Sequence, residues 1–519
     1  MTPTEITTIK SKRENKILNR ERLAELRAEC GSKTIVHCHG VFDVLHAGHL
    51  AYFESAKKFG DILVVSITAD PHVNKGPGRP YFNSSIRSNM LAALEIIDFV
   101  YVNNNPTATS CIEILKPHFY VKGPDYRDKS QDPTGAIYEE EHAVESHGGK
   151  LVFTNDDTYS SSFLINNFFH AWNDDQQAAI NQVKAAGGLT AIEELLEKIS
   201  KMKISVIGEP IVDTYVFCKP EAISSKSPCI SAKYLFQEDY AGGSLAIANH
   251  LSDFVKEVSL VTTHGDEPWF QKILKEKLDS RIKLHDEVLP NIPSPRKTRY
   301  IADDKRQRLF ELTNLQSDQW EYHSATAFLE KMEKATHGND ACIVADFGHG
   351  LFESEVLKAV QSINSFLALN VQTNSSNIGF NSYTKYQHFS YLSIDLKEAR
   401  IAFQDRHSPH LELLSKVHKS CSKKNASVSM TLGPMGSFYI TPNQKKEIKV
   451  PAFADSVVDA VGAGDAYFSL SAMLVKAGAP EIIVPFVGNV FAGLKTKIIG
   501  NKSPVTKAQL IRAITAILK

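Results

Sequence analysis

The chain has few cysteines and no long apolar run, and each absence excludes a class of protein. Its seven cysteines are scattered, and no two of them form a Cys-x-x-Cys pair. A disulfide framework or a structural zinc cluster is therefore not expected. No apolar run reaches the roughly 18 residues of a membrane span. The polar residues 9–16 also lack the apolar core of a secretory signal. We expect a soluble, cytoplasmic protein.

An excess of charge of either sign is also lacking. Lys and Arg number 58, Asp and Glu number 59, and the formal net charge is −1. Such a chain has no overall field that attracts it to nucleic acid or to an anionic membrane. We therefore expect neither as a partner. Any anion-binding site must be built locally, from loops and helix ends.

The 519 residues are enough for two to four domains, at roughly 150 residues each. Apolar strand patterns alternate with helical patterns, which predicts parallel α/β sheets with ligand sites at the carboxyl ends of the strands. Residues 172–202 contain no strand pattern, and two helical segments flank Gly187 and Gly188 there. We predict a domain at 1–171, a helical connector at 172–202 and a second domain at 203–519.

A histidine-rich segment, His-Gly-Val-Phe-Asp-Val-Leu-His-Ala-Gly-His, follows the first predicted strand at residues 39–49. Gly40 allows the backbone to approach a phosphate closely. His46 and His49 are three residues apart at a helix start, so they share one face beside unpaired N–H groups. This arrangement suits the charge that develops on a triphosphate attacked at its α-phosphorus. The alternatives are ordinary histidines or a zinc site, although no Cys or carboxylate cluster completes the latter.

This segment and four later ones resemble the cytidylyltransferase-like family of nucleotidyltransferases, over about residues 33–170. The later segments are Lys75-Gly76, Gly78-Arg79-Pro80 with Arg87, the run at 121–126 and the Tyr-Ser-Ser-Ser run at 159–162. The resemblance implies a Rossmann-like domain in which His46 and His49 stabilise the transferring phosphate and Lys75 neutralises charge. It also implies nucleotide or phosphate contacts from Gly40, Phe42, Arg87, Lys122, Ser160, Ser161 and Ser162. Taken alone, the lysines are typical of solvated surface charges and the serines of a helix cap.

A second glycine-rich segment, Gly462-Ala463-Gly464-Asp465, precedes a helical pattern. Its N–H groups can cradle a phosphoryl group, and the helix start adds a positive dipole end. Asp465 can accept a proton from an attacking hydroxyl. The alternative is a glycine turn with an acidic helix cap.

The chain from about 203 to 519 resembles the ribokinase-like (PfkB) carbohydrate kinases. The resemblance is carried by residues 458–468, 208–213, 242–249, 346–350 and 431–436. It implies a ribokinase-like α/β domain with a small β lid, in which Asp465 is the general base and Mg²⁺ bridges the phosphates of ATP. The implied sugar contacts are Asp213, Gly242, Gly243, Asn249 and Arg299. The implied nucleotide and phosphate contacts are Thr431, Gly433, Gly436, Gly462, Ala463, Gly464 and Asn489.

Some positions depart from the pattern of that family. Asp395-Leu-Lys-Glu398 stands where Asn-x-x-Glu is common, so Glu398, with Asp395, is the expected Mg²⁺ contact through water. Residues 372–377 stand where the resemblance leads us to expect an Asp-x-Lys-Gly type of segment. The asparagines there, Asn374 and Asn377, and the later Asn381 are either turn formers or the mark of a different ligand environment. Glu209 stands where Asp is common.

Together the two halves resemble the bifunctional heptose kinase/adenylyltransferases of ADP-heptose synthesis, with the domain order inverted. The resemblance implies ATP-dependent phosphorylation of the anomeric hydroxyl of a heptose phosphate. It further implies transfer of a nucleotide from ATP, CTP or GTP to the sugar 1-phosphate. A basic set, Lys297, Arg299, Arg306 and Arg308, either meets a second phosphate or forms a solvated strand.

Two alternative functions remain open. The first is a cytidylyltransferase for a polyol phosphate, such as glycerol phosphate, with an associated kinase. The second is a kinase-like half that only senses a ligand or dimerises. The run at 229–236 is a candidate lid strand or an ordinary edge strand. Since the kinase family commonly dimerises through its lid, we predict a homodimer.

Overall fold

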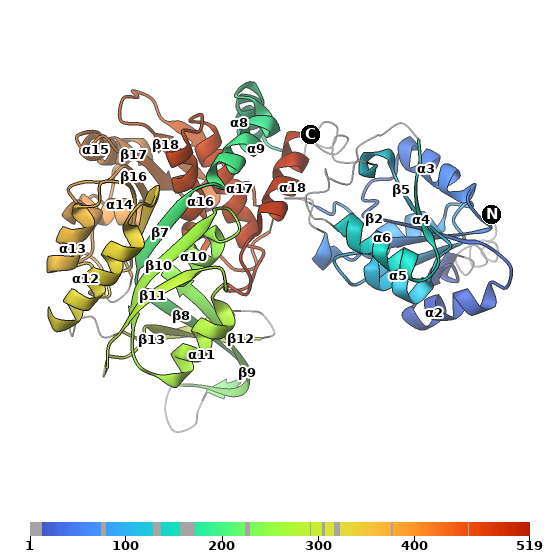
Figure 1. The fold of residues 1–519 in the computed structure, drawn as a ribbon, viewed down its shortest axis with the longest axis horizontal. Helices are drawn as coiled ribbons and strands as arrows, with labels where there is room; N and C mark the ends of the chain where they lie inside the picture. The colour runs from blue at the N-terminus through green and yellow to red at the C-terminus, as the bar shows by residue number, and fades with distance from the viewer. Residues whose placement is uncertain are drawn as a thin grey trace. The chain divides into compact units, whose positions relative to one another are not determined.

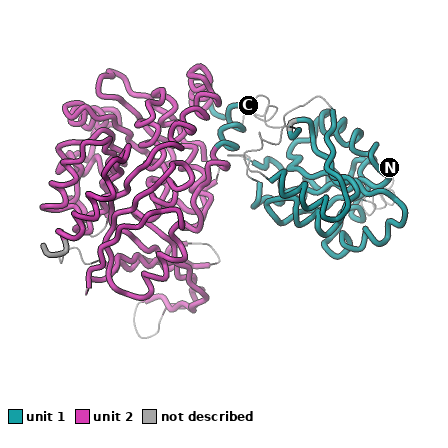
Figure 2. Tube along the Cα trace, in the orientation of Figure 1, with its two compact units in different colours: residues 1–173, 511–519 teal, residues 174–510 magenta. Residues whose placement is uncertain are grey.

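A computed structural model of the chain divides into two compact units, Met1–Asn173 with Ile511–Lys519, and Asp174–Leu510 (Figure 2). Both units are α/β, which confirms the predicted fold class. No helix of the described residues is long and apolar enough to cross a membrane. The structure describes residues 13–73, 79–127, 136–155, 172–223, 229–290, 292–303, 307–315, 322–374, 377–454 and 456–519.

The described part of the first unit is built on a parallel six-stranded sheet with the order β1-β4-β3-β2-β5-β6. The chain order reverses between β2 and β5, and such a switch point opens a crevice at the carboxyl ends of the strands. The strands are β1 (Ile17–Leu18), β2 (Ile35–Gly40), β3 (Ile62–Thr68), β4 (Phe99–Asn103), β5 (Phe119–Lys122) and β6 (Lys150–Phe153). The helices are α2 (Arg20–Glu29), α3 (Ala47–Lys57), α4 (Ser84–Ala92), α5 (Thr109–Leu115) and α6 (Ala136–Ser146).

The larger sheet of the second unit has nine strands in the described residues, in the order β11-β10-β7-β14-β15-β16-β17-β18-β19. Only the β17–β18 and β18–β19 pairs are antiparallel. The strands are β7 (Lys203–Gly208), β10 (Glu257–His264), β11 (Lys283–Val288), β14 (Ala341–Asp346), β15 (Phe366–Val371), β16 (Tyr391–Asp395), β17 (Ser427–Thr431), β18 (Ser437–Ile440) and β19 (Ile448–Val450).

Helices pack around the second unit, and α16 and α17 lie side by side (Figure 1). The helices of this unit are α8 (Asp174–Ala185), α9 (Gly188–Ile199), α10 (Ser244–Leu251), α11 (Pro268–Lys277), α12 (Tyr322–Thr336), α13 (Ser354–Gln361), α14 (Leu396–Ala402), α15 (His410–Ser422), α16 (Ala463–Ala477) and α17 (Ile483–Lys495). Helix α18 (Lys507–Leu518) begins in the second unit, and its residues from 511 on are grouped with the first.

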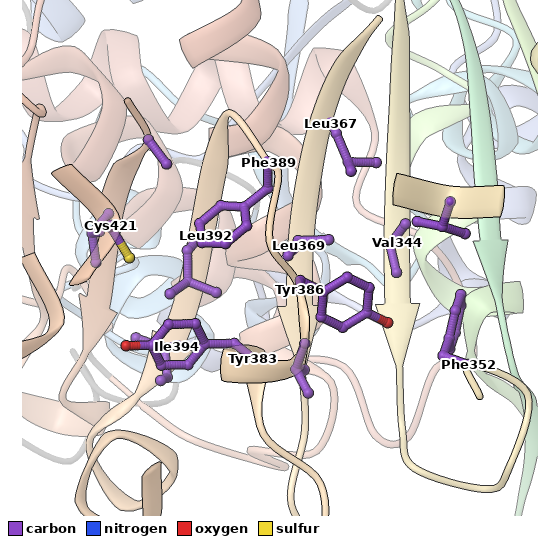
Figure 3. Close-up of a cluster of buried hydrophobic side chains, with 14 of the residues drawn as sticks. Val344, Phe352, Leu367, Leu369, Tyr383, Tyr386, Phe389, Leu392, Ile394 and Cys421 are labelled. Atoms are coloured by element: carbon purple, nitrogen blue, oxygen red, sulfur yellow. The ribbon is translucent and has the colours of Figure 1, made fainter. Parts of the chain in front are cut away.

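A large cluster of buried apolar side chains packs against the middle strands of the larger sheet (Figure 3). Val344, Leu369 and Leu392 project from three neighbouring strands and are fully buried. Tyr386 packs among them, and its hydroxyl donates to Asp346 Oδ2 at 2.8 Å. The same cluster that supplies the core therefore also anchors a carboxylate at the carboxyl end of β14.

A separate four-stranded sheet, with the order β13-β12-β8-β9, matches the predicted small β lid. Its strands are β8 (Pro210–Ile223), β9 (Ile230–Gly243), β12 (Arg296–Ala302) and β13 (Gln307–Asn314). The predicted lid strand at 229–236 lies in β9, where Tyr234 and Phe236 are exposed. Because β8 begins two residues after β7 ends, the lid is joined directly to the centre of the larger sheet.

The helices α8 and α9, predicted as a connector, pack within the second unit. Ile192, Leu196 and Ile199 form an apolar stripe on α9, with the spacing of one helix face, and all three are buried. Gln176 Nε2 donates to Ala452 O at 2.8 Å, and Lys198 Nζ donates to Ala477 O. Residues of this stretch are therefore part of the fold that carries the second predicted site.

Candidate functional site

The two predicted catalytic histidines lie together at the start of α3. His46 is the N-cap residue in extended conformation, and the rings of His46 and His49 stack with centroids 3.9 Å apart. The ring of Phe42 meets His49 edge-on at 5.2 Å. Since α3 follows β2, both imidazoles lie beside the switch point at a positive helix end.

The loop before α3 is tightly packed at position 40. Phe42 has a φ of 47°, in the left-handed region, and a Cβ on Gly40 would lie 3.0 Å from the Phe42 ring. Asp43 then accepts the N–H groups of Tyr81 and Phe82 at 2.8 and 2.9 Å. Asp43 thus ties this loop to the one before α4. Its role was missed in the sequence because it depends on a segment about 38 residues away.

Lys122 ends β5, the strand beside β2 at the switch point. Its ammonium pairs with Glu140 at 2.8 Å and lies over the rings of Tyr120 and Tyr126. The Tyr120 hydroxyl also donates to Glu140 at 3.0 Å. Lys122 is therefore in position for an anion, but its charge is shared with a buried carboxylate.

Arg87, predicted to contact a nucleotide or phosphate, makes its hydrogen bonds within the fold. Its side chain is fully buried on α4. The guanidinium donates to the carbonyl oxygens of Phe82, Val41 and Thr68 at 2.6–2.9 Å and to Asp70 at 2.6 Å. A planar group with several fixed donors can brace several loops at once, which is the role that this geometry assigns.

The other histidines of the segment face the interior. His37 Nε2 and His39 Nδ1 both contact Ser66 Oγ, at 2.8 and 2.7 Å. Burial lowers the pKa of each imidazole to about 3, so both are neutral. Over the described ranges, no group of three or more His, Cys, Asp or Glu side chains is placed to hold a metal ion. Lys75, Ser160, Ser161 and Ser162 lie outside the described residues.

The predicted general base of the second unit is buried at the start of α16. Gly462, the N-cap residue, has a φ of 78°, which favours glycine there. Gln372 Nε2 donates to Asp465 Oδ1 at 2.6 Å. Burial raises the pKa of Asp465 to about 6, although the hydrogen bond from Gln372 opposes the increase. Ala463 and Gly464 complete the first turn, where backbone N–H groups point out of the helix.

Asp213 lies on β8 of the lid, close enough to Asp465 for their charges to interact. It pairs with Arg299 of β12, and Arg299 Nε also pairs with Glu311 at 2.8 Å. The negative charge of Asp213 contributes to the raised pKa of Asp465, so the two carboxylates lie within electrostatic reach. A Cβ on Gly242 would lie 2.4 Å from Asp213 Oδ2. Gly242 is therefore required for the Asp213 carboxylate to occupy this position.

Glu209 positions the loop after β14. Its buried carboxylate accepts the N–H groups of Phe347, His349 and Leu351 at 2.6, 3.0 and 3.2 Å. Burial and the nearby charge of Asp346 raise the pKa of Glu209 to about 8. The longer side chain at this position lets one carboxylate hold three amides of a neighbouring loop.

Asparagines from the segment that differs from the family pattern support the loop after β14. Asn377 Nδ2 donates to Phe347 O at 2.9 Å, and Asn381 Nδ2 donates to Asp346 Oδ1 at 2.9 Å. Asn374 Nδ2 also donates to Phe347 O, at 2.8 Å. Their side chains thus take the first of the two predicted roles and form the turn.

Asp395 and Glu398 form a capping box at the start of α14. Glu398 Oε2 accepts the Asp395 N–H at 2.9 Å, and its Oε1 accepts the Thr373 N–H at 3.3 Å. Burial and the adjacent Asp395 raise the pKa of Glu398 to about 8. Mg²⁺ binds oxygen ligands and usually keeps several waters. A buried carboxylate whose oxygens already accept backbone hydrogen bonds fits a contact through metal-bound water.

The predicted nucleotide turn follows β17, which ends at Thr431. Gly433 and Gly436 both have positive φ, and Leu432 N–H donates to Gly436 O at 2.8 Å. Asn489, predicted to contact the nucleotide, is buried in α17, and its amide donates to Ser437 Oγ and Val450 O at 3.0 and 3.1 Å. Asn489 therefore connects β18 and β19.

Asn249, predicted to contact the sugar, makes two hydrogen bonds within the fold. It lies in α10, where its amide donates to Lys277 O at 2.8 Å and its carbonyl accepts the Asp279 N–H at 2.9 Å. Both ends of the side chain therefore fix the segment at the end of α11. Gly243, the other end of the predicted sugar-binding segment, has a φ of 59° and is the N-cap residue of α10.

Comparison with known families identifies the family of each part of the chain. Residues 201–496, more than half of the chain, match the pfkB family of carbohydrate kinases. The chain belongs to the pfkB family. Residues 37–167 match the cytidylyltransferase-like family. These matches confirm a carbohydrate-kinase domain and a nucleotidyltransferase domain in one chain, with the nucleotidyltransferase domain first.

Curated relatives of this pfkB member match over one region. The "Bifunctional protein HldE" of Campylobacter fetus subsp. fetus is 45% identical over 130 residues, which are 24% of this chain and 28% of the relative. The "Bifunctional protein HldE" of Trichlorobacter lovleyi is 34% identical over 168 residues, which are 31% of this chain and 33% of that relative. The chain thus spans about a third of the length of these relatives. Phosphofructokinase-2 from Escherichia coli shares the fold, at a TM-score of 0.51 and 9% identity over 61% of this chain and all of that one.

Proposed function

We propose that the chain is a bifunctional enzyme of nucleotide-sugar synthesis. Its second unit phosphorylates a sugar with ATP, and its first unit joins the sugar 1-phosphate to a nucleotide with release of pyrophosphate. The observation that carries the proposal is Asp465, buried at the start of α16 with Oδ1 held by Gln372. A carboxylate so placed can accept the proton of an attacking hydroxyl beside the amides that stabilise the phosphoryl group.

The kinase step follows from the position of each group. The hydrogen bond from Gln372 fixes one oxygen of Asp465 and leaves Oδ2 to take the proton. With a pKa of about 6, Asp465 is ionised at neutral pH and still basic enough to accept that proton. Asp213 on the lid orients the sugar hydroxyl. Glu398 would hold Mg²⁺ through a metal-bound water, and the metal would supply positive charge that neutralises the phosphates of ATP.

The transfer step uses the start of α3. An oxygen of the sugar 1-phosphate attacks the α-phosphorus of the nucleoside triphosphate, and the bond to pyrophosphate breaks. His46 and His49 stack at 3.9 Å beside the switch point, where they stabilise the charge that develops on the phosphorus oxygens. Lys122 at the end of β5 adds positive charge from the other side of the switch point.

Substrate identity is the finer part of the proposal. The resemblance to heptose kinase/adenylyltransferases supports a heptose phosphate as the sugar and ATP as the nucleotide donor, with CTP as the other candidate. We also propose a cytoplasmic homodimer. Its contact would be formed by the lid, on which Tyr234, Phe236, Phe310 and Leu312 are exposed.

A substrate matrix tests the proposal. ATP, CTP and GTP are each combined with heptose phosphates and glycerol phosphate, and pyrophosphate release and product mass are measured. When the sugar 1-phosphate is supplied separately, Asp465→Asn should abolish sugar phosphorylation and leave pyrophosphate release intact, whereas His46→Ala should do the reverse. Phosphorylation that survives Asp465→Asn unchanged, or pyrophosphate release that survives His46→Ala, contradicts the corresponding half of the proposal.

A further inference from the structure

Lys495 is a buried cation beneath the glycine loop of the kinase unit. It is the last residue of α17 and has no exposed surface. Its ammonium donates to Val461 O at 2.9 Å, Gly500 O at 2.6 Å and Ile498 O at 3.4 Å. A neutral amine has only two N–H groups, so three carbonyl acceptors require the charged form.

The charge of Lys495 has no direct carboxylate partner among the described residues. Instead it lies in the field of Asp459, Asp465 and Asp213, which counteract the lowering of its pKa by burial. A buried ammonium is unfavourable unless it is hydrogen-bonded and compensated. An apolar side chain of similar length would leave these three carbonyl oxygens without a donor, so the ammonium holds them in place.

Asp459 and Lys495 both form hydrogen bonds with the backbone of Val461 and Gly500. Asp459 accepts the N–H groups of Val461 and Gly500 at 3.1 and 2.8 Å. Lys495 donates to the carbonyl oxygens of Val461 and Gly500. The segment before α16 and the turn after α17 are therefore connected through the N–H and the C=O of both Val461 and Gly500. We call this arrangement the clamp.

This clamp sets the direction of an amide in the glycine loop. In a trans peptide the C=O and the following N–H point in opposite directions. Because the Val461 carbonyl points at Lys495, the Gly462 N–H points away from Lys495. Gly462 is the N-cap of α16, at the end of the helix where Asp465 lies. The orientation of the proposed anion hole thus depends on a cation on its far side.

We propose that Lys495 is a positioning residue for phosphoryl transfer, a built-in cation that orients the amides of residues 462–464 through the carbonyl of Val461. The inference rests on the proposed kinase function. It assigns a role that the glycine motif alone does not contain, and it predicts that a small cation with N–H donors can replace the side chain. An ammonium ion is the matching probe, because it carries the same charge and the same donors.

The test uses the full chain with Lys495→Ala and Lys495→Met, and with Lys476→Met on α16 as the matched control. We expect Lys495→Ala to lower kcat of sugar phosphorylation about 100-fold, as loss of an outer-shell positioning group does, with little change in KM for the sugar. Ammonium chloride should restore at least a tenth of the lost kcat. Tetramethylammonium, which has the charge but no N–H group and is larger, should not. Lys476→Met should behave as wild type.

Hydrogen exchange provides a readout that does not depend on turnover. The amides of residues 462–465 should exchange faster in Lys495→Ala than in wild type, and ammonium should restore their protection. If Lys495→Ala keeps the wild-type kcat and exchange rates, the inference is wrong. It is equally wrong if activity is lost and ammonium restores neither kcat nor protection, since the role would then be structural. If wild type phosphorylates no sugar, the kinase function fails, and the exchange experiment still decides whether Lys495 holds the loop.

Discussion

Replacing Asp465 by Asn should remove kinase activity and, at the same time, stabilise the second unit. Asp465 is buried, and Asn has nearly the same shape with an oxygen that can still accept from Gln372. Burial raises the pKa of Asp465 from 3.8 to about 6. The folded protein therefore holds its proton more tightly than the unfolded chain does, and ionisation of Asp465 destabilises the fold.

The size of this effect depends on pH. At about 1.4 kcal/mol for each tenfold change in proton affinity, the difference between 3.8 and about 6 corresponds to about 3 kcal/mol. This penalty is complete at pH 8, falls to about half at pH 5, and disappears below pH 3.8, where both states are protonated. Asn carries no charge, so Asp465→Asn should raise the free energy of unfolding by about 3 kcal/mol at pH 8 and by about half of that at pH 5.

Calorimetry at both pH values measures this gain. Because the chain has two compact units, their transitions are analysed separately. Only one transition should move in Asp465→Asn, and the other serves as the internal control. A variant that is less stable than wild type at pH 8, or equally stabilised at both pH values, would falsify the assignment of a buried, strained carboxylate.

Three further results are expected. Kinase activity should fall tenfold for each pH unit below about 6, where Asp465 becomes protonated. Gln372→Leu should raise the pH at which half of the activity is lost, because it removes a hydrogen bond to the ionised form of Asp465. Initial rates measured between pH 5 and 8 check both results. Arg87→Met should lower the free energy of unfolding of the first unit by about 3–5 kcal/mol in urea denaturation, whereas the exposed Arg22→Met should have little effect. Asn249→Ala should leave KM for the sugar unchanged but lower stability by about 1–3 kcal/mol, since two backbone groups lose their partner; an unchanged melting temperature would contradict this structural role.

Much of the fold was predictable because it depends on local patterns. Alternating strand and helix signals gave both α/β units, and the glycine-rich segments were correctly placed at helix starts. The start of α4 at Ser84 is also a local feature, because Asn83 caps the helix by accepting the Ile86 N–H.

The partners of the site residues were less predictable, because sheet order brings them together from distant segments. Gln372 and Asp465 are 93 residues apart. No spacing rule connects them, and the Gln372 segment departs from the expected pattern. For Arg87, Asn249 and Asn489 the residue type suited a ligand, but the direction of the side chain was decided by nearby backbone groups. A motif indicates which residues occupy a place, whereas tertiary packing decides which way they point.

Strand β8 has a consequence for product release. Asp213 and Tyr215 are two residues apart on it and so share one face. Tyr215 donates to Asp459 Oδ2 at 2.6 Å, so the strand that carries the proposed sugar contact is also bonded to the segment before the glycine loop. If β8 moves when the product leaves, Tyr215 must also withdraw from Asp459. The lid and the segment before α16 therefore cannot separate without losing this hydrogen bond.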